Sequence, residues 1–216
     1  MSDFRKEFIS FCIDSGVLRF GRFKTKAGRM SPYFFDAGLF NDGAKLGRLG
    51  QFYAKAILAA DRPFDMLFGP AYKGIPLVAS VAIALAQAGH NVAYSFNRKE
   101  AKDHGEGGRT IGAALAGRVL IVDDVISAGI SVRESVQLIE AEGASACGVV
   151  IALDRLERGA GARSAVQEVR ENFGLPVIAI ADLDDLVKFL DAKPDLAPTL
   201  IEIEHYRQLY GADAHA

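Results

Sequence analysis

The sequence predicts an α/β fold, with an open, mostly parallel sheet flanked by helices. Short apolar runs at residues 66–68, 119–122, 146–153 and 176–181 alternate with longer segments of helical period. That pattern is typical of strands buried on both faces of a parallel sheet. Two of these runs pass directly into a glycine-rich or an acidic loop. Because ligands bind beyond the carboxyl ends of the strands in open parallel sheets, we expect the functional site at these loops.

Composition favours one compact domain spanning residues 1–216. Of the 216 residues 50% are hydrophobic, which suits a single α/β domain with a sizeable core. The formal net charge of −2 gives no global attraction to nucleic acid or to an anionic membrane. Cys12 and Cys147 lie far apart in apolar surroundings, which indicates reduced core thiols. With no signal-peptide pattern and no membrane-spanning run, we expect a cytoplasmic protein.

The first part of the chain predicts a helix, a small hairpin and a second helix. The first helix has phenylalanines on one face and ends at Gly16. Extended runs at 17–20 and 33–36 flank a polar turn, which predicts a small hairpin. This unit, within residues 1–40, is too small to be the main sheet, so we expect it to form a hood over one end of it. Residues 43–60 have the pattern of an amphipathic helix.

Aromatic residues in the predicted hood are candidates for contact with a planar ligand. Phe34 and Phe35 are consecutive, so in a strand their side chains face opposite ways and at most one enters the core. The other could stack on a flat ring, and Lys26 could pair with a carboxylate on that ring. An ordinary aromatic core with a surface lysine is the alternative, and composition alone favours it.

The loop GPAYKGIP, residues 69–76, follows the predicted strand 66–68. Its glycines and prolines indicate a tight turn before an apolar helix at 77–88. The helix N-terminus and Lys73 together could bind an anion. The alternative is a plain turn with an exposed lysine.

A charged, glycine-rich stretch follows the predicted strand 91–96. It has no apolar period, so we predict a mobile lid over residues 97–108 rather than a packed element. Basic groups on a lid can close over a polyanion such as diphosphate and exclude water. The alternative is a solvated run of charges. Basic residues in this region are Arg98, Lys99, Lys102, His104 and Arg109.

The most informative stretch is VLIVDDVISAGIS, residues 119–131. Four apolar residues run into Asp123 and Asp124, and a Ser/Gly loop then leads into a helical pattern at 132–142. A phosphate would fit over 127–131, where small residues let the backbone approach and serines add donors. Neighbouring aspartates suit the vicinal hydroxyls of a ribose, or a divalent metal held largely through water. These features predict a nucleotide or sugar-phosphate ligand, unless the acids only cap the next helix.

The strand at 146–153 is followed by Arg155, again at a carboxyl end. Arg155 could meet a substrate carboxylate, although a surface salt bridge is the alternative that the residues alone favour. The remaining predicted elements are a helix ending near 172 that opens with a capping box of Ser164 and Gln167, a strand at 176–181, a helix at 183–190 capped by Asp182, and a helix at 194–210.

Three motifs together resemble the orotate phosphoribosyltransferases, which have the type I phosphoribosyltransferase fold. The stretch 119–131 alone resembles the phosphoribosyl diphosphate (PRPP) signature of phosphoribosyltransferases in general. The lid sequence NRKEAKDHGEGG and the stretch KAGRMSPYFFDAG, with FGPAYKGIPL, narrow the resemblance to the orotate family over about residues 8–210. It implies transfer of the 5-phosphoribosyl group from PRPP to orotate, giving orotidine 5′-phosphate and diphosphate in de novo pyrimidine (UMP) synthesis.

The resemblance also implies roles for individual residues. Catalytic roles would belong to Lys102, His104, Asp123 and Asp124. Binding of PRPP would involve Tyr72, Lys73, Arg98, Lys99, Lys102, His104, Asp123, Asp124, Val125, Ile126, Ser127, Ala128, Gly129, Ile130 and Ser131. Orotate would be bound by Lys26, Phe34, Phe35, Ser127 and Arg155.

The family further implies Mg²⁺ as cofactor, held through PRPP and water near Asp123 and Asp124, and a homodimer with lid residues shared across its interface. Two positions depart from the family pattern: Ser127 stands where threonine is common, and Met30 where a basic residue is common. A non-catalytic PRPP-sensing regulator is one alternative, but it would not need a cationic lid. A purine phosphoribosyltransferase is another, and its base pocket would not need cations for a carboxylate.

Overall fold

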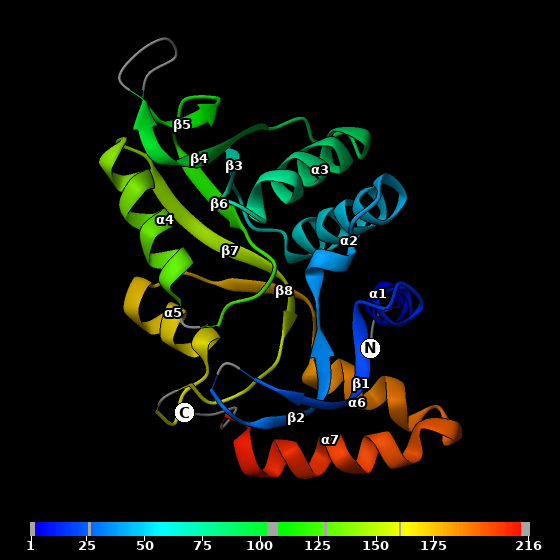
Figure 1. Cartoon of the computed structure of the whole chain (residues 1–216). Helices are drawn as coiled ribbons and strands as arrows, with labels where there is room; N and C mark the ends of the chain where they lie inside the picture. The colour runs from blue at the N-terminus through cyan, green and yellow to red at the C-terminus, as the bar shows by residue number, and fades with distance from the viewer. Residues whose placement is uncertain (1–2, 26, 103–107, 128, 160, 213–216) are drawn as a thin grey trace.

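The computed structural model describes residues 3–25, 27–102, 108–127, 129–159 and 161–212, with residues 3 and 99–102 described by their backbone alone. Helices cover both faces of a central sheet, and a two-stranded hairpin lies at one end of it (Figure 1). The predicted fold class, an open and mostly parallel sheet flanked by helices with a small hood, is therefore confirmed. No helix in the described ranges is long and apolar enough to cross a membrane.

Within the described residues the central sheet has six strands in the order β5-β4-β3-β6-β7-β8. Neighbouring strands are parallel except β4 and β5. The chain winds outward from β3 to β5 on one side and from β6 to β8 on the other. Such a reversal opens a crevice at the carboxyl ends of β3 and β6. The strands are β3 (Met66–Gly69), β4 (Ala93–Lys102), β5 (Gly108–Gly112), β6 (Arg118–Val122), β7 (Ser145–Asp154) and β8 (Val177–Asp182).

Two apolar cores lie on the two faces of the sheet. Along β6, Val119 and Ile121 enter one core while Leu120 and Val122 enter the other, because successive strand residues face opposite ways. Helices α4 and α5 cover the first face and α1, α2 and α3 the second (Figure 1). The helices are α1 (Asp3–Asp14), α2 (Gly43–Ala60), α3 (Gly74–Gln87), α4 (Ile130–Ala141), α5 (Ala165–Phe173), α6 (Leu183–Asp191) and α7 (Ala197–Tyr210).

The predicted hairpin is present and longer than expected. Strands β1 (Leu18–Lys24) and β2 (Met30–Phe35) pair antiparallel, from Leu18 opposite Phe35 to Lys24 opposite Met30. We call β1 and β2 the hood. Helix α7 packs against β2, so the end of the described chain closes onto its beginning (Figure 1). Two short 3-10 helices, Ala37–Leu39 and Pro194–Leu196, follow the hood and precede α7.

The prediction that residues 97–108 form no packed element is wrong for the outer parts of this stretch, which are strands, whereas its role as a lid stays a prediction. Asn97 pairs with Thr110 and Lys102 pairs with Gly108 in an antiparallel register. This edge ladder is made by backbone groups, so it needs no apolar period, and the charged side chains concealed it from sequence reasoning. Residues 103–107 of the predicted lid lie outside the described residues.

Two helices begin earlier in the chain than predicted. Helix α3 begins at Gly74 and α4 at Ile130, which is two to three residues earlier than the apolar period indicated. The N-terminus of α4 therefore lies within the predicted phosphate loop. Capping boxes at Ser164 and Asp182 open α5 and α6, the first of them as predicted.

Candidate active site

The predicted site residues of β3 and β6 meet at the crevice where the strand order reverses. The backbone of the acidic pair continues the ladder with β7, since Asp123 N donates to Val150 O at 3.0 Å and Ala152 N donates to Asp124 O at 2.9 Å. From α2, the buried hydroxyl of Tyr53 donates to Asp123 O at 2.7 Å. The backbone of the acidic pair is thus fixed by the sheet, and at Asp123 by a helix as well.

Asp123 is nearly enclosed, with 8% of its surface exposed. Its Oδ2 accepts a hydrogen bond of 2.6 Å from the Ser131 hydroxyl, and its Oδ1 accepts one of 2.9 Å from Asp124 N. Burial raises the pKa of Asp123 to about 6; the Ser131 bond acts against this rise and the charge of Asp124 adds to it. The carboxylate can therefore change charge in a mildly acidic range.

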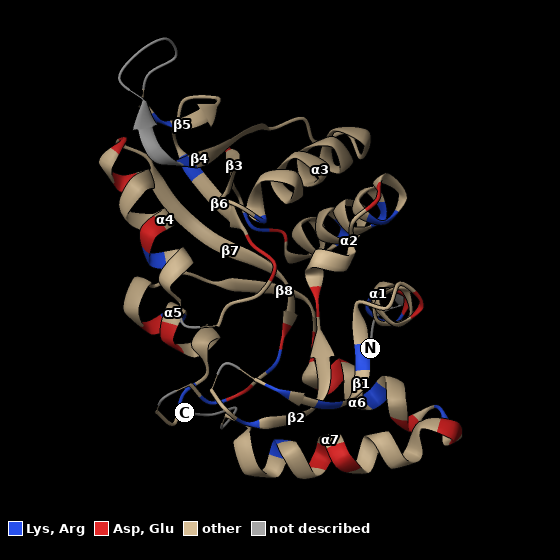
Figure 2. Cartoon of the chain, viewed as in Figure 1, with Lys and Arg blue, Asp and Glu red and all other residues tan. Residues whose placement is uncertain are grey.

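Lys73 points at the other carboxylate. Its ammonium donates to Asp124 Oδ2 at 2.7 Å, and Figure 2 shows the acidic segment after β6 beside the basic start of α3. Burial by itself lowers the pKa of Lys73, but the hydrogen bond to Asp124 and the charges of Asp124 and Asp36 outweigh it, so the pKa is raised. The lysine is exposed, as the alternative from the sequence had it, with 63% of its side chain accessible, but it is paired with Asp124.

The loop between β3 and α3 is built on two mutually packed glycines. A Cβ on Gly69 would lie 2.2 Å from Gly74 O, and a Cβ on Gly74 would lie 2.8 Å from Gly69 C. This close crossing places Tyr72, 64% exposed, and Lys73 at the mouth of the crevice. The loop is also tied to β4, because Ala71 N donates to Asn97 Oδ1 at 2.7 Å. Its Ala71–Tyr72 peptide bond is cis.

The predicted phosphate loop runs from β6 into α4. Ile126 packs against the core, whereas Ser127 is exposed and Ile130 is 60% exposed. Gly129 has φ 67°, which favours glycine, and is the residue before α4. No side chain of the described residues caps α4, so the alternative that the acids serve as its caps is wrong. Ala128 lies outside the described residues.

The hood carries the two aromatic rings predicted to contact a planar ligand. Phe35 packs against the core and meets the Phe40 ring edge-on, while Phe34 stacks on Phe23 with ring centroids 5.5 Å apart. The opposite facing predicted for Phe34 and Phe35 is confirmed. Lys26, predicted to join them, lies outside the described residues.

Arg155 is not the surface salt bridge that the residues alone favoured. Its side chain is 22% exposed and donates from Nε and Nη2 to Glu157 Oε1 at 2.8 and 2.5 Å. Nη2 also donates to the Ser31 hydroxyl at 3.0 Å, and the guanidinium lies 4.3 Å from the centre of the Tyr33 ring. The arginine is therefore fixed between β7 and the hood.

Lid positions are only partly described. Arg98, on β4, has a buried Nη1 with no hydrogen-bond partner among the described residues. A buried guanidinium nitrogen in that state favours an anionic ligand. The side chains of Lys99 and Lys102, and the whole of His104, lie outside the described part of the chain.

Several contacts of the site carried little or no signal in the sequence. Ser31, Asn97 and Tyr206 are ordinary polar or aromatic residues, and their partners lie 124, 26 and 49 residues away. Only Glu157, two residues after Arg155, offered a hint as a neighbouring opposite charge. Such a hint is common in surface loops and does not distinguish a fixed pair.

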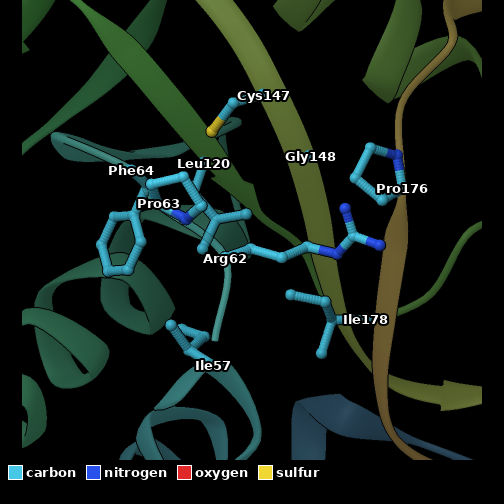
Figure 3. A pocket seen from close by; sticks show the side chains of 9 residues that line it. All are labelled: Ile57, Arg62, Pro63, Phe64, Leu120, Cys147, Gly148, Pro176 and Ile178. Atoms are coloured by element: carbon cyan, nitrogen blue, oxygen red, sulfur yellow. The ribbon is translucent and has the colours of Figure 1, made fainter. Parts of the chain in front are cut away.

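A separate hollow lies toward the amino ends of β6, β7 and β8, away from the crevice. Figure 3 shows the Arg62 side chain extending between Pro176 and Ile178, with Cys147 on the opposite wall. None of the predicted site residues lines it. Cys12 and Cys147 are both free thiols, the first in the core and the second half-buried at this hollow, where burial raises the pKa of Cys147.

Known proteins agree with this geometry. The family model of the phosphoribosyl transferase domain matches residues 40–177, which include β3, β6 and both loops of the crevice. The chain thus has the fold of a phosphoribosyltransferase and belongs to that class of enzymes. The chain is 68% identical to the orotate phosphoribosyltransferase of Nitrosospira multiformis, over 98% of this chain and 93% of that one. It is 64% identical to that of Thiobacillus denitrificans, over 98% of this chain and 100% of that one.

A solved structure supports the same assignment. The orotate phosphoribosyltransferase of Francisella tularensis aligns with a TM-score of 0.88 and 39% identity, covering 95% of this chain and all of that one. The chain belongs to the orotate phosphoribosyltransferase family. The family resemblance and the enzyme class predicted from the sequence are confirmed.

Proposed function

We propose that the chain transfers the 5-phosphoribosyl group of PRPP to orotate, giving orotidine 5′-phosphate and diphosphate in pyrimidine synthesis. The observation that carries this proposal is the meeting of Asp123, Asp124, Lys73 and the start of α4 at one crevice. Arg155 follows β7, the parallel neighbour of β6, at the same edge of the sheet. Family membership points the same way. Neither a regulator that only binds PRPP nor a purine phosphoribosyltransferase would need Arg155 to bind a base carboxylate.

The sugar phosphate would lie along the crevice. Its 5′-phosphate would bind over the exposed Ser127 and the N-terminus of α4, where free backbone N–H groups favour an anion. The ribose hydroxyls would donate to Asp123 and Asp124. As the bond to diphosphate breaks, the sugar becomes oxocarbenium-like, and two fixed carboxylates stabilise that positive charge. The reaction needs no covalent nucleophile.

The departing diphosphate needs cations. Lys73 and the unpaired Nη1 of Arg98 support this assignment from the described residues. Lys99, Lys102 and His104 are proposed to complete the set when the lid closes, with His104 or Lys102 meeting the leaving oxygens. Tyr72 would lie beside them at the mouth of the crevice.

Mg²⁺ is the proposed cofactor. Each oxygen of Asp123 and Asp124 accepts one hydrogen bond and keeps a second lone pair, so both acids could contribute to a bound ion. The described residues contain no group of three or more metal-binding side chains. That donor set suits an ion held mainly by substrate oxygens and water, as is usual for Mg²⁺. When bound, the ion would neutralise charge on the diphosphate.

Orotate would bind beside the hood and Arg155. Its carboxylate would pair with Arg155 and Lys26, and its ring would lie near Phe34, Phe35 and Ser127. Held there, the anionic ring nitrogen would face the anomeric carbon of PRPP. Met30 is 47% exposed at the start of β2, and no contact with the described residues assigns it a role.

We also propose a cytoplasmic homodimer in which the lid of one subunit serves the site of the other. Large apolar side chains are exposed at Tyr72, Ile83 and Tyr94. These residues come from the loop after β3, from α3 and from β4, elements that contact one another beside the lid. Exposed apolar side chains on neighbouring elements favour a protein interface there.

Turnover with four bases tests the proposed function. Purified protein with PRPP and Mg²⁺ is given orotate, uracil, adenine or hypoxanthine, and diphosphate release is measured. We expect turnover with orotate and at least about a hundredfold lower kcat/KM with uracil, which lacks the carboxylate that Arg155 would bind. Preference for a purine would contradict the assignment. Repeating the orotate reaction with EDTA tests the need for a divalent ion.

A further inference from the structure

Glu157 holds the guanidinium of Arg155 from one side. Both Nε and Nη2 of Arg155 donate to Glu157 Oε1, at 2.8 and 2.5 Å. The two side chains are 22% and 16% exposed. Taking an arginine this far out of water costs free energy unless a counter-charge and hydrogen bonds offset the loss of hydration. Glu157 supplies both before any substrate arrives.

Glu157 is itself fixed by phenols from two distant parts of the chain. Tyr206 of α7 donates to Oε2 at 3.2 Å, and Tyr33 of the hood donates to Oε1 at 3.4 Å. The backbone is pinned as well, since Glu157 forms a bridge with Gly211 and Ala212 N donates to Leu156 O at 2.8 Å. The carboxylate is therefore part of a built network rather than a loose partner.

Within this network, Nη1 of Arg155 is the guanidinium nitrogen that could bind a ligand. The hydrogen bonds that Arg155 donates to described residues come from Nε and Nη2. The face of the guanidinium lies against the ring of Tyr33, with 4.3 Å between the guanidinium carbon and the ring centre. Nη1 is the nitrogen that remains, and its two N–H groups lie in the plane set by the other contacts.

We propose that Glu157 is a positioning residue for the base site: together with Tyr206 it orients Arg155 so that Nη1 meets the carboxylate of the acceptor base. This inference rests on the proposed function and extends it to a residue that does not touch substrate. Tyr33 and Tyr206 lie outside residues 40–177, the part matched by the general phosphoribosyltransferase family. Their position fits a task specific to the acceptor rather than to PRPP, which all members of the class share.

An opposite role for Glu157 is also conceivable, as a stand-in that the substrate carboxylate displaces from Arg155. The contacts disfavour it. Displacement would leave a largely buried carboxylate without its counter-charge, and the hydroxyls of Tyr33 and Tyr206 bonded to that uncompensated charge. The two roles predict opposite changes in the affinity for orotate, so one variant separates them.

The test uses Glu157→Gln, which keeps the shape and removes the charge, and Tyr206→Phe, which removes one hydroxyl. Glu171→Gln is the matched control, because Glu171 pairs with Arg163 on the surface. For each variant kcat and the KM values for orotate and PRPP are measured with the full-length protein. We expect Glu157→Gln to raise the KM for orotate at least about tenfold while the KM for PRPP changes less than about twofold. Tyr206→Phe should show a smaller change of the same kind, and the control none.

Each other outcome overturns the inference. A lower KM for orotate in Glu157→Gln would mean that Glu157 competes with the substrate, and equal rises in both KM values would mean a merely structural role. If Glu157→Gln does not fold, Tyr206→Phe decides the same question by the same split between the two KM values. Wild-type protein that fails to use orotate would overturn the proposed function itself, whereas normal wild-type turnover with an unchanged variant overturns only the positioning role.

Discussion

The ammonium group of Lys73 lies 2.7 Å from Asp124 Oδ2, so a cation proposed for diphosphate neutralises a carboxylate proposed for ribose. The two side chains come from loops after different strands, β3 and β6, which are neighbours only because the sheet reverses its winding there. Substrate binding would replace this pair with two others, Lys73 with diphosphate and Asp124 with a ribose hydroxyl or Mg²⁺. The ion pair keeps both charges compensated until then.

Asp124→Asn should lower turnover at least about tenfold, equivalent to about 1.4 kcal/mol of transition-state stabilisation. The loss follows from the missing negative charge near the ribose. Folding should survive, since Lys73 is 63% exposed in its side chain and can be hydrated instead. Turnover is measured at saturating PRPP and orotate, and circular dichroism checks the fold. A folded variant with wild-type turnover would remove Asp124 from the site.

Asp123 should make the substrate-free protein less stable as the pH rises. Its pKa of about 6 lies above the ordinary value of 3.8. A carboxyl whose pKa is raised by folding stabilises the fold below its unfolded pKa, and this contribution is lost as the pH rises through about 6. The free energy of unfolding of Asp123→Asn should therefore match that of the wild type near pH 4. At pH 8 it should exceed the wild-type value by up to about 3 kcal/mol. Urea unfolding without ligands at both pH values measures the difference, and a constant difference would show that ionisation of Asp123 is not its cause.

Gly69→Ala should destabilise the fold by about 2–4 kcal/mol, because the new Cβ overlaps backbone in a packed loop. The Cβ added at residue 69 would lie 2.2 Å from Gly74 O and 2.7 Å from Val78 Cβ. Gly47→Ala is the control: Gly47 is exposed within α2, and nothing lies within 4 Å of its added Cβ. Gly47→Ala should raise the free energy of unfolding by up to about 1 kcal/mol. Thermal unfolding compares the two, and similar midpoints would contradict the steric argument.

Local features of the fold and the site are predictable from the sequence. Helix α2 has the bounds that its apolar period indicated, and the acids after β6 stand at a strand end as predicted. Such features are local, so the sequence carries them directly. The ladder between Asn97 and Thr110 depends on backbone pairing at a sheet edge. The contact between Tyr206 and Glu157 depends on the packing of a helix whose tyrosine is 49 residues away in the sequence. Neither contact produces a periodic pattern in the sequence.

The proposed exchange of lids between subunits predicts complementation. An inactive Lys102→Ala homodimer mixed with an inactive Asp124→Asn homodimer, under conditions that exchange subunits, should recover activity. Each heterodimer would hold one site with both the wild-type lid and the wild-type acid. With random exchange about half of the dimers are mixed, so recovery should approach a quarter of the wild-type activity per subunit.

Labelled subunits verify the exchange in this experiment. Verified exchange without recovery would mean that each lid serves its own subunit. Mixing Asp124→Asn with Asp123→Asn is the matched control, because both lesions lie on the same loop and no mixed dimer could restore a complete site.

The contacts of the hood have a consequence for the order in which the chain folds. Ser31 bonds to Arg155 across 124 residues, and Arg29 bonds to Arg158 O across 129. On the sugar-phosphate side, Asp123 and Ser131 are only 8 residues apart, and Lys73 and Asp124 are 51 apart. Closing longer loops costs more entropy and tends to occur later. The crevice for PRPP should thus consolidate first and the base side last, so mild denaturant should increase amide exchange in β2 before β6.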